Sequence, residues 1–128
     1  MRILTMAACV LAVPAAAQQS AGGPVPTVPI TLSSFHFEPA VIHLKAGVPV
    51  VLVLRNDSGG RHDFFAPDFF STAKINPASV PHLHNGKAEV PGHSDVAIAL
   101  VPAPGHFSVK CTHPLHSSLG MKATIIVD

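Results

Sequence analysis

The chain has 128 residues, of which 48% are apolar and 12% charged, and its formal net charge is +1. This composition is typical of one globular domain, and it excludes both an intrinsically disordered chain and a basic nucleic-acid binder. No apolar run reaches the ~20 residues that span a membrane. Histidine, with 9 copies, outnumbers Lys and Arg together, whereas Cys occurs 2 times and Met 3 times.

Residues 1–17 predict a cleavable signal peptide. Met1-Arg2 gives a positive start, residues 3–13 an apolar stretch, and Ala15-Ala16-Ala17 an A-x-A cleavage site. The apolar stretch is too short for a membrane anchor. A lipoprotein site at Cys9 is the weaker alternative, because the apolar run continues past it. We therefore expect a periplasmic or secreted protein with no transmembrane segment in the mature chain.

Removal of the signal peptide changes what the composition means. Cys9, Met1 and Met6 leave with it, so the mature chain keeps one cysteine, Cys111, and one methionine, Met121. A single cysteine cannot form an internal disulfide. In an oxidising compartment it is expected to pair between chains, to be reactive or to bind a metal.

Short apolar runs separated by turn residues follow a flexible N-terminal segment predicted at 18–29. The run at 48–54 is nearly all apolar, as in a central strand buried on both faces. Around Phe69, Phe70 and Ile75 we expect a short helix or a packed loop, because nearby prolines prevent a long helix. The predicted strands are 30–37, 41–45, 48–54, 62–65, 87–90, 95–101, 106–111 and 121–127.

This spacing of about seven to eight strands predicts an all-β fold, a Greek-key β-sandwich, in a single domain over residues 30–128. No internal repeat, charge block or long helical period competes with this interpretation.

The most informative segment runs from Lys110 to Met121. Strand alternation places Cys111 on the inward face at the end of one strand and Met121 on the inward face at the start of the next. The loop that joins these two strands carries His116. Another histidine, His62, follows the predicted central strand after a turn-rich loop and can therefore lie at the same end of the sandwich.

These side chains suit copper. A trigonal set of two imidazoles and a thiolate, with a weak axial thioether, is the ligand set of a blue-copper electron-transfer site. A buried core cysteine or methionine is the ordinary alternative for each residue alone. The mature chain's only Cys and only Met, however, bracket a histidine within 11 residues, so we favour one type 1 copper site.

The segment Cys111-Thr112-His113-Pro114-Leu115-His116 with Met121, together with the upstream His62-Asp63, resembles the cupredoxin family of small blue copper proteins. The resemblance implies an eight-stranded Greek-key sandwich with copper at one end and a role in carrying single electrons between redox partners. It also implies that His62, Cys111, His116 and Met121 are the ligands.

The segment departs from the azurin-like form in two ways. His116 and Met121 have four residues between them, one more than in that form, which leaves the axial bond length and the reduction potential open. His113 also lies inside the loop, where the family pattern has no ligand. We favour His116 as the ligand and keep His113 as the alternative.

Other polar residues have more general interpretations. Asp63 stands where azurin-like proteins carry a bracing Asn, and we expect Asp63 and Thr112 to brace the ligand loops. Asn56 could tie the loop that follows it, but we favour an ordinary turn residue. His82, His84 and His113 are candidates for an additional metal site, although for His82 and His84 we favour a flexible polar loop. The remaining histidines are expected on the solvated surface: His36, His43, His93 and His106.

Two functions fit this sequence. The first is a monomeric single-electron carrier that meets a redox partner protein. The second is a copper-handling or copper-tolerance protein that meets a copper-trafficking protein. We do not expect an enzyme, because a copper oxidase needs further copper sites that a chain of this length cannot hold, and we expect no nucleic-acid partner.

Overall fold

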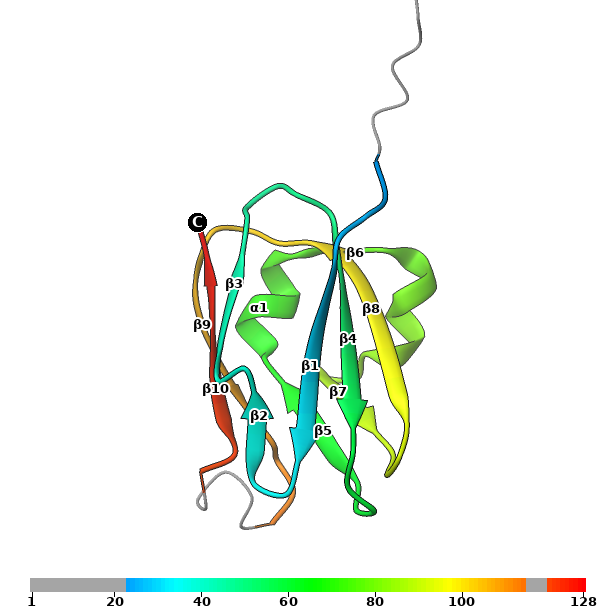
Figure 1. The fold of residues 1–128 in the computed structure, drawn as a ribbon. Coiled ribbons are helices and arrows are strands. Elements are labelled where there is room, and N and C mark those ends of the chain that lie inside the picture. The colour runs from blue at the N-terminus through cyan, green and yellow to red at the C-terminus, as the bar shows by residue number, and fades with distance from the viewer. Residues whose placement is uncertain (1–22, 115–119) are drawn as a thin grey trace, which may run out of the picture.

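The computed structural model describes residues 23–114 and 120–128 as two five-stranded sheets packed face to face (Figure 1). The predicted all-β sandwich is therefore confirmed. The first sheet has the order β2-β1-β4-β8-β6, formed by His36–Glu38, Thr27–Ser33, Val50–Asn56, Asp95–Val101 and Lys74–Ile75. The second has the order β3-β10-β9-β5-β7, formed by Val41–Leu44, Lys122–Val127, Gly105–Lys110, His62–Phe65 and Lys87–Val90.

The core lies between the two sheets and follows the period-two pattern of the strands. In β10, Ala123, Ile125 and Val127 are buried, while Lys122 and Thr124 are exposed. The first sheet contributes fully buried side chains to the core, which include Ile30, Leu32, Leu52, Leu54 and Ile98. Burial of this apolar surface supplies the main driving force for closing the sandwich.

Two short helices follow β5 in the chain, one on each side of β6. Helix α1, Pro67–Thr72, begins at a proline and buries Phe69 and Phe70. The 3-10 helix η1, Pro77–His82, is capped by Asn76, whose side chain accepts a hydrogen bond from the Ala78 N–H. A short helix is one of the two alternatives predicted for the region around Phe69.

The structure corrects three details of the predicted strands. The strand expected at 30–37 is two strands, because Phe35 takes a left-handed turn (φ 67°) between β1 and β2. Strand β1 begins at Thr27, so residues 27–29 belong to the sheet and not to the flexible segment expected at 18–29. With the short β6, the described residues form ten strands, where seven to eight were expected.

The predicted central strand is in the right place but is less buried than expected. Strand β4 lies between β1 and β8. Its inward residues are buried, whereas the outward Val51 and Val53 are only half-buried. The expectation of burial on both faces is therefore wrong, because the second sheet covers only the inner face.

One end of the sandwich gathers the chain segments that carry the predicted ligands. Strand β4 ends, β5 begins, β9 ends and β10 begins at this end (Figure 1). Lys110 at the end of β9 pairs with Lys122 at the start of β10. Within the described ranges, no helix is long and apolar enough to cross a membrane.

Candidate metal centre

Cys111 and Met121 flank the connection between β9 and β10. Cys111 directly follows β9, Met121 directly precedes β10, and both are fully buried. The Cys111 N–H donates a hydrogen bond to the Met121 carbonyl oxygen at 3.2 Å. The two sulfur side chains thus extend the inward faces of two adjacent strands, as the alternation predicts.

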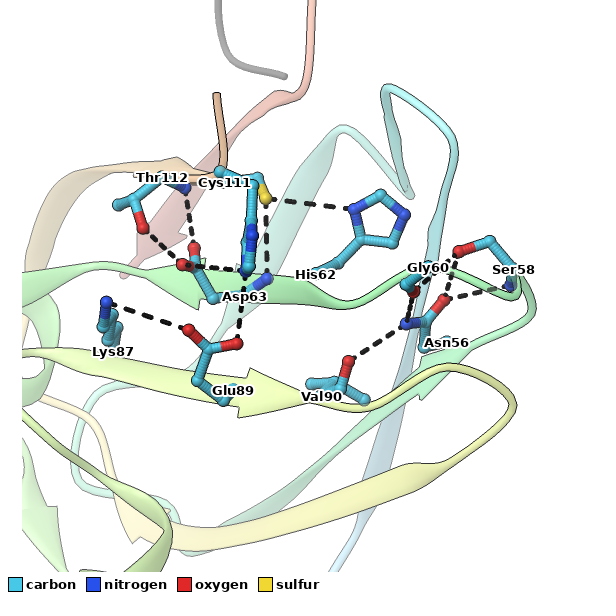
Figure 2. A network of polar contacts seen from close by, with 11 residues as sticks. Asn56, Ser58, Gly60, His62, Asp63, Lys87, Glu89, Val90, Cys111 and Thr112 are labelled. Atoms are coloured by element: carbon cyan, nitrogen blue, oxygen red, sulfur yellow. Dashed lines mark hydrogen bonds and ion pairs between the residues drawn. The ribbon is translucent and has the colours of Figure 1, made fainter. Parts of the chain in front are cut away.

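His62 approaches Cys111 from the neighbouring strand. It is the first residue of β5 and only 3% exposed. Its Nδ1 lies 3.9 Å from the Cys111 Sγ. A dashed line marks this contact in Figure 2. Pairing of Phe65 with Lys110 joins β5 to β9. It brings together His62 and Cys111, which are 49 positions apart in sequence.

The sulfur and nitrogen atoms of this pair are suitably placed for one metal ion. Metal–imidazole and metal–thiolate bonds of about 2.0 and 2.3 Å can join atoms up to ~4.3 Å apart, and the two atoms lie 3.9 Å apart. The two residues and Met121 are buried, which shields their donor atoms from water. The thiolate and thioether sulfurs are soft donors. This donor chemistry fits copper. His116 lies outside the described residues.

Burial sets the protonation state of the Cys111 thiol. Desolvation raises its pKa above the ordinary value, the backbone N–H groups of Asp63 and His113 lower it, and the carboxylates of Asp63 and Glu89 raise it. Because the net shift is upward, the metal-free side chain is a neutral thiol at pH 7. A metal ion that binds the thiolate must therefore displace a proton.

Asp63 links the strand of His62 to the residue that follows Cys111. Its fully buried carboxylate accepts a hydrogen bond from the Thr112 N–H at 2.8 Å and another from the Thr112 hydroxyl (Figure 2). Its own backbone N–H donates to the Cys111 Sγ at 3.5 Å. These contacts connect His62, Cys111 and the start of the ligand loop.

Asn56 has a larger role than the sequence suggested. It is 1% exposed, and its Nδ2 donates to the carbonyl oxygens of Gly60 at 2.7 Å and Val90 at 3.0 Å. Its Oδ1 accepts from the N–H and the hydroxyl of Ser58. The favoured interpretation as an ordinary turn residue is wrong. Its position on the inward face of β4 was the signal that could have identified it.

His113 faces carboxylates on the outer side of the second sheet. Its Nε2 lies 3.2 Å from Glu89 Oε2 and 3.8 Å from Asp63 Oδ2, and one oxygen or nitrogen of each residue lies within 4.8 Å of the others. Nothing in the sequence pattern around Glu89 marks it as a site residue. Its pairing with Asp63 across β5 and β7 becomes visible only in the register.

The other histidines lie apart from this group. His82 ends η1, and His84 forms a bridge with Lys87; both are exposed. In residues 23–114 and 120–128, neither belongs to a group of three or more donors that could hold a metal ion. Their metal role stays a prediction. Surface positions are confirmed for the four histidines expected there: His36, His43, His93 and His106.

A buried thiol, imidazole and thioether at one end of a β-sandwich define a protein of the small copper-binding class. The model of the family "Copper binding proteins, plastocyanin/azurin family" matches residues 27–128. The chain belongs to this family, the cupredoxins, and copper is its cofactor. A comparison with curated proteins found no match.

Solved structures of low sequence identity share the fold. Reduced auracyanin from the photosynthetic bacterium Roseiflexus castenholzii is 15% identical, with a TM-score of 0.60 over 83% of this chain and 99% of its own. Auracyanin A, a "blue" copper protein from Chloroflexus aurantiacus, is 19% identical, with a TM-score of 0.55 over 80% and 99%. McoA multicopper oxidase from Aquifex aeolicus is 14% identical, with a TM-score of 0.63 over 82% of this chain but only 30% of the oxidase.

Proposed function

We propose that the protein is an exported, mononuclear type 1 copper protein that carries single electrons between redox partner proteins. The proposed ligands are His62, Cys111, His116 and Met121. The observation that carries this proposal is the buried Cys111 Sγ lying 3.9 Å from His62 Nδ1, next to buried Met121, in a chain of the plastocyanin/azurin family.

Bound copper supplies a one-electron couple between Cu(I) and Cu(II). The protein's part is to bind the ion and limit rearrangement. Cys111 binds as a thiolate, His62 and His116 as neutral imidazoles, and Met121 as a weak thioether. The burial of Cys111 and Met121 supports exclusion of water from the sulfur ligands.

The hydrogen bonds around the ligands support a rigid site. The Asp63 carboxylate holds Thr112 next to Cys111, while the Asp63 N–H donates to the Cys111 sulfur. Hydrogen bonds to a ligand sulfur tune the reduction potential of a metal centre. Because Asp63 contacts both ligand-bearing segments, it limits their relative movement when the charge of the site changes.

Export is part of the proposal and rests on the signal peptide expected at residues 1–17. In the oxidising compartment that export implies, a single cysteine needs a role. Binding of its thiolate to a metal ion supplies that role. The mass of protein purified from an exporting bacterial host tests this: mature protein should begin at Gln18, and an uncleaved chain would contradict export.

A potentiometric titration of the copper-loaded protein tests electron transfer. We expect one reversible electron per chain, with the same spectrum after repeated cycles. His116→Ala should shift the potential and change the spectrum, whereas His106→Ala on the exposed surface of β9 should change neither. Irreversible oxidation, or a His116→Ala protein identical to the wild type, would contradict the proposal.

A copper-handling role is the second candidate, with a copper-trafficking protein as partner. It is favoured by the group of Asp63, Glu89 and His113, whose donor atoms lie close enough for one more ion. Copper stoichiometry separates the two functions. Two tightly bound copper ions per chain, falling to one in Glu89→Gln but not in the exposed Glu38→Gln, would favour handling. One copper in all three proteins would favour the electron carrier.

A further inference from the structure

A row of lysines crosses the outer face of the second sheet. Lys122 of β10 lies opposite Lys110 of β9, Lys110 lies opposite Phe65 of β5, and Phe65 lies opposite Lys87 of β7. Directly opposed residues of antiparallel strands project to the same face. Three of the chain's cationic side chains therefore stand in one cross-strand row around an aromatic ring.

The row is open to solvent and only partly neutralised. Lys110 and Lys122 are exposed, and neither forms an ion pair within residues 23–114 and 120–128. Lys87 instead lies 3.8 Å from Glu89. The Lys110 ammonium stands 5.6 Å from the centroid of the Phe65 ring, and a hollow of about 350 Å³ is lined by Phe65, Pro67, Asp68, Ser108, Val109, Lys110 and Lys122.

The stability of the sheet does not account for this arrangement. Like charges directly opposite each other on adjacent strands destabilise the pairing, and Lys110 and Lys122 are such a pair. The contact of Lys110 with Phe65 offsets part of that cost. An anionic partner would offset this repulsion. The row therefore favours binding of anionic groups.

The row also borders the metal centre. Lys110 immediately precedes Cys111, and Lys122 immediately follows Met121. A molecule seated on these lysines is therefore one residue along the backbone from two of the proposed copper ligands. An electron from such a molecule would have a short route through covalent bonds, from the surface to the Cys111 sulfur.

We infer that the face formed by Lys122, Lys110, Phe65 and Lys87 is the docking surface for an acidic redox partner. This inference rests on the proposed electron-carrier function. The carboxylates of the partner would lie against Lys110 and Lys122 and its apolar atoms against Phe65. One electron would then pass between the partner and the copper centre, oxidising one and reducing the other.

The test uses the oxidation of reduced, copper-loaded protein by hexacyanoferrate(III), a small trianion. Each hexacyanoferrate(III) accepts one electron from the protein and becomes hexacyanoferrate(II). The test variant is Lys110→Glu/Lys122→Glu. The matched control is Lys45→Glu/Lys74→Glu, which changes the net charge equally at two exposed lysines outside the row. A stopped-flow rate is measured near 0.1 M and 1 M salt, where screening lengths are about 10 and 3 Å.

We expect the test variant to react at least ~10-fold more slowly than the control variant at the lower salt concentration, because local charge steers association. The difference should shrink towards unity at 1 M salt. Poly-glutamate should slow the wild-type reaction and leave the test variant unaffected. Oxidation by tris(phenanthroline)cobalt(III), a trication, should not be slowed by the test substitutions.

Equal rates for the two double variants, or equal slowing with both oxidants, would overturn the docking surface alone, provided that their copper spectra match the wild type. A wild-type protein that takes up copper but cannot be reduced and reoxidised would overturn the proposed function itself. Rescue of the rate by Lys110→Arg/Lys122→Arg would support a requirement for positive charge.

Discussion

Asp63 joins two segments of the metal centre through one buried side chain. Its fully buried carboxylate accepts two hydrogen bonds from Thr112. Asp63→Ala should lower the free energy of unfolding by about 3 kcal/mol, because two hydrogen bonds to a charged acceptor would be lost. It should also weaken copper binding by ~10- to 100-fold, as expected when an outer-shell partner of the ligands is lost.

Urea unfolding and a competitive copper titration measure these two effects. Thr112→Val is the matched comparison, because it removes the hydroxyl but keeps the backbone N–H that bonds Asp63 at 2.8 Å. Thr112→Val should lower the free energy of unfolding and the copper affinity less than Asp63→Ala does. Wild-type stability and copper affinity in Asp63→Ala would show that the carboxylate does not support the site.

The raised pKa of Cys111 couples copper binding to pH. Folding favours the protonated thiol, so this group stabilises the metal-free protein below its unfolded pKa, and the contribution is lost as pH rises through the folded pKa. Copper requires the thiolate. At pH 8, anaerobic addition of one equivalent of Cu(I) should release about one proton per chain.

A pH-stat measures the released proton directly. Cys111→Ser should release none, because its hydroxyl keeps its proton. Copper affinity of the wild type should rise about tenfold per pH unit below the thiol pKa. An affinity independent of pH over this range would contradict a protonated thiol in the metal-free site.

The loop between β4 and β5 depends on Asn56, which bonds Gly60, Ser58 and Val90 at once. Asn56→Ala leaves the carbonyl oxygens of Gly60 and Val90 without this donor, the second of them in a buried contact, and should cost about 3 kcal/mol. Asn76→Ala is a useful comparison, because Asn76 makes one exposed capping bond to Ala78 and should cost only ~1 kcal/mol. Equal costs in urea unfolding would argue against a special role for Asn56.

The same loop packs tightly against the turn after β7. A Cβ atom on Gly92 would lie 2.3 Å from the Gly59 carbonyl oxygen, whereas one on Gly60 would meet nothing within 4 Å. Gly92→Ala should therefore destabilise the fold by about 2 kcal/mol or more, and Gly60→Ala should change it by less than ~0.5 kcal/mol. Thermal unfolding of both variants measures the difference, and equal melting temperatures would contradict the close contact.

Strand periodicity explains which elements could be predicted from the sequence. The alternation through Val109, Cys111 and Met121 gave the inward direction of both sulfur ligands. It could not give the break at Phe35, which depends on a left-handed turn made by a bulky residue. Nor could it give the lysine row or the Asp63–Glu89 pair, because both depend on the register between strands that are distant in sequence.

At the scale of the whole molecule, copper would join β5 to the connection between β9 and β10. Because the unfolded chain lacks this assembled site, binding should stabilise the fold. Free copper at about 1,000 times the dissociation constant should add ~4 kcal/mol to the free energy of unfolding. Calorimetry of the metal-free and copper-loaded protein measures this stabilisation. Copper should add much less to the free energy of unfolding of Cys111→Ser. Identical melting temperatures would mean that the ion does not bridge the folded segments.

The visible absorption spectrum of the Cu(II)-loaded protein tests the central claim most directly. Coordination of Cu(II) by the Cys111 thiolate should produce an intense absorption band from sulfur-to-copper charge transfer, and Cys111→Ser should abolish it. A colourless Cu(II) complex of the wild type, or the same band in Cys111→Ser, would contradict a type 1 copper site at this end of the sandwich.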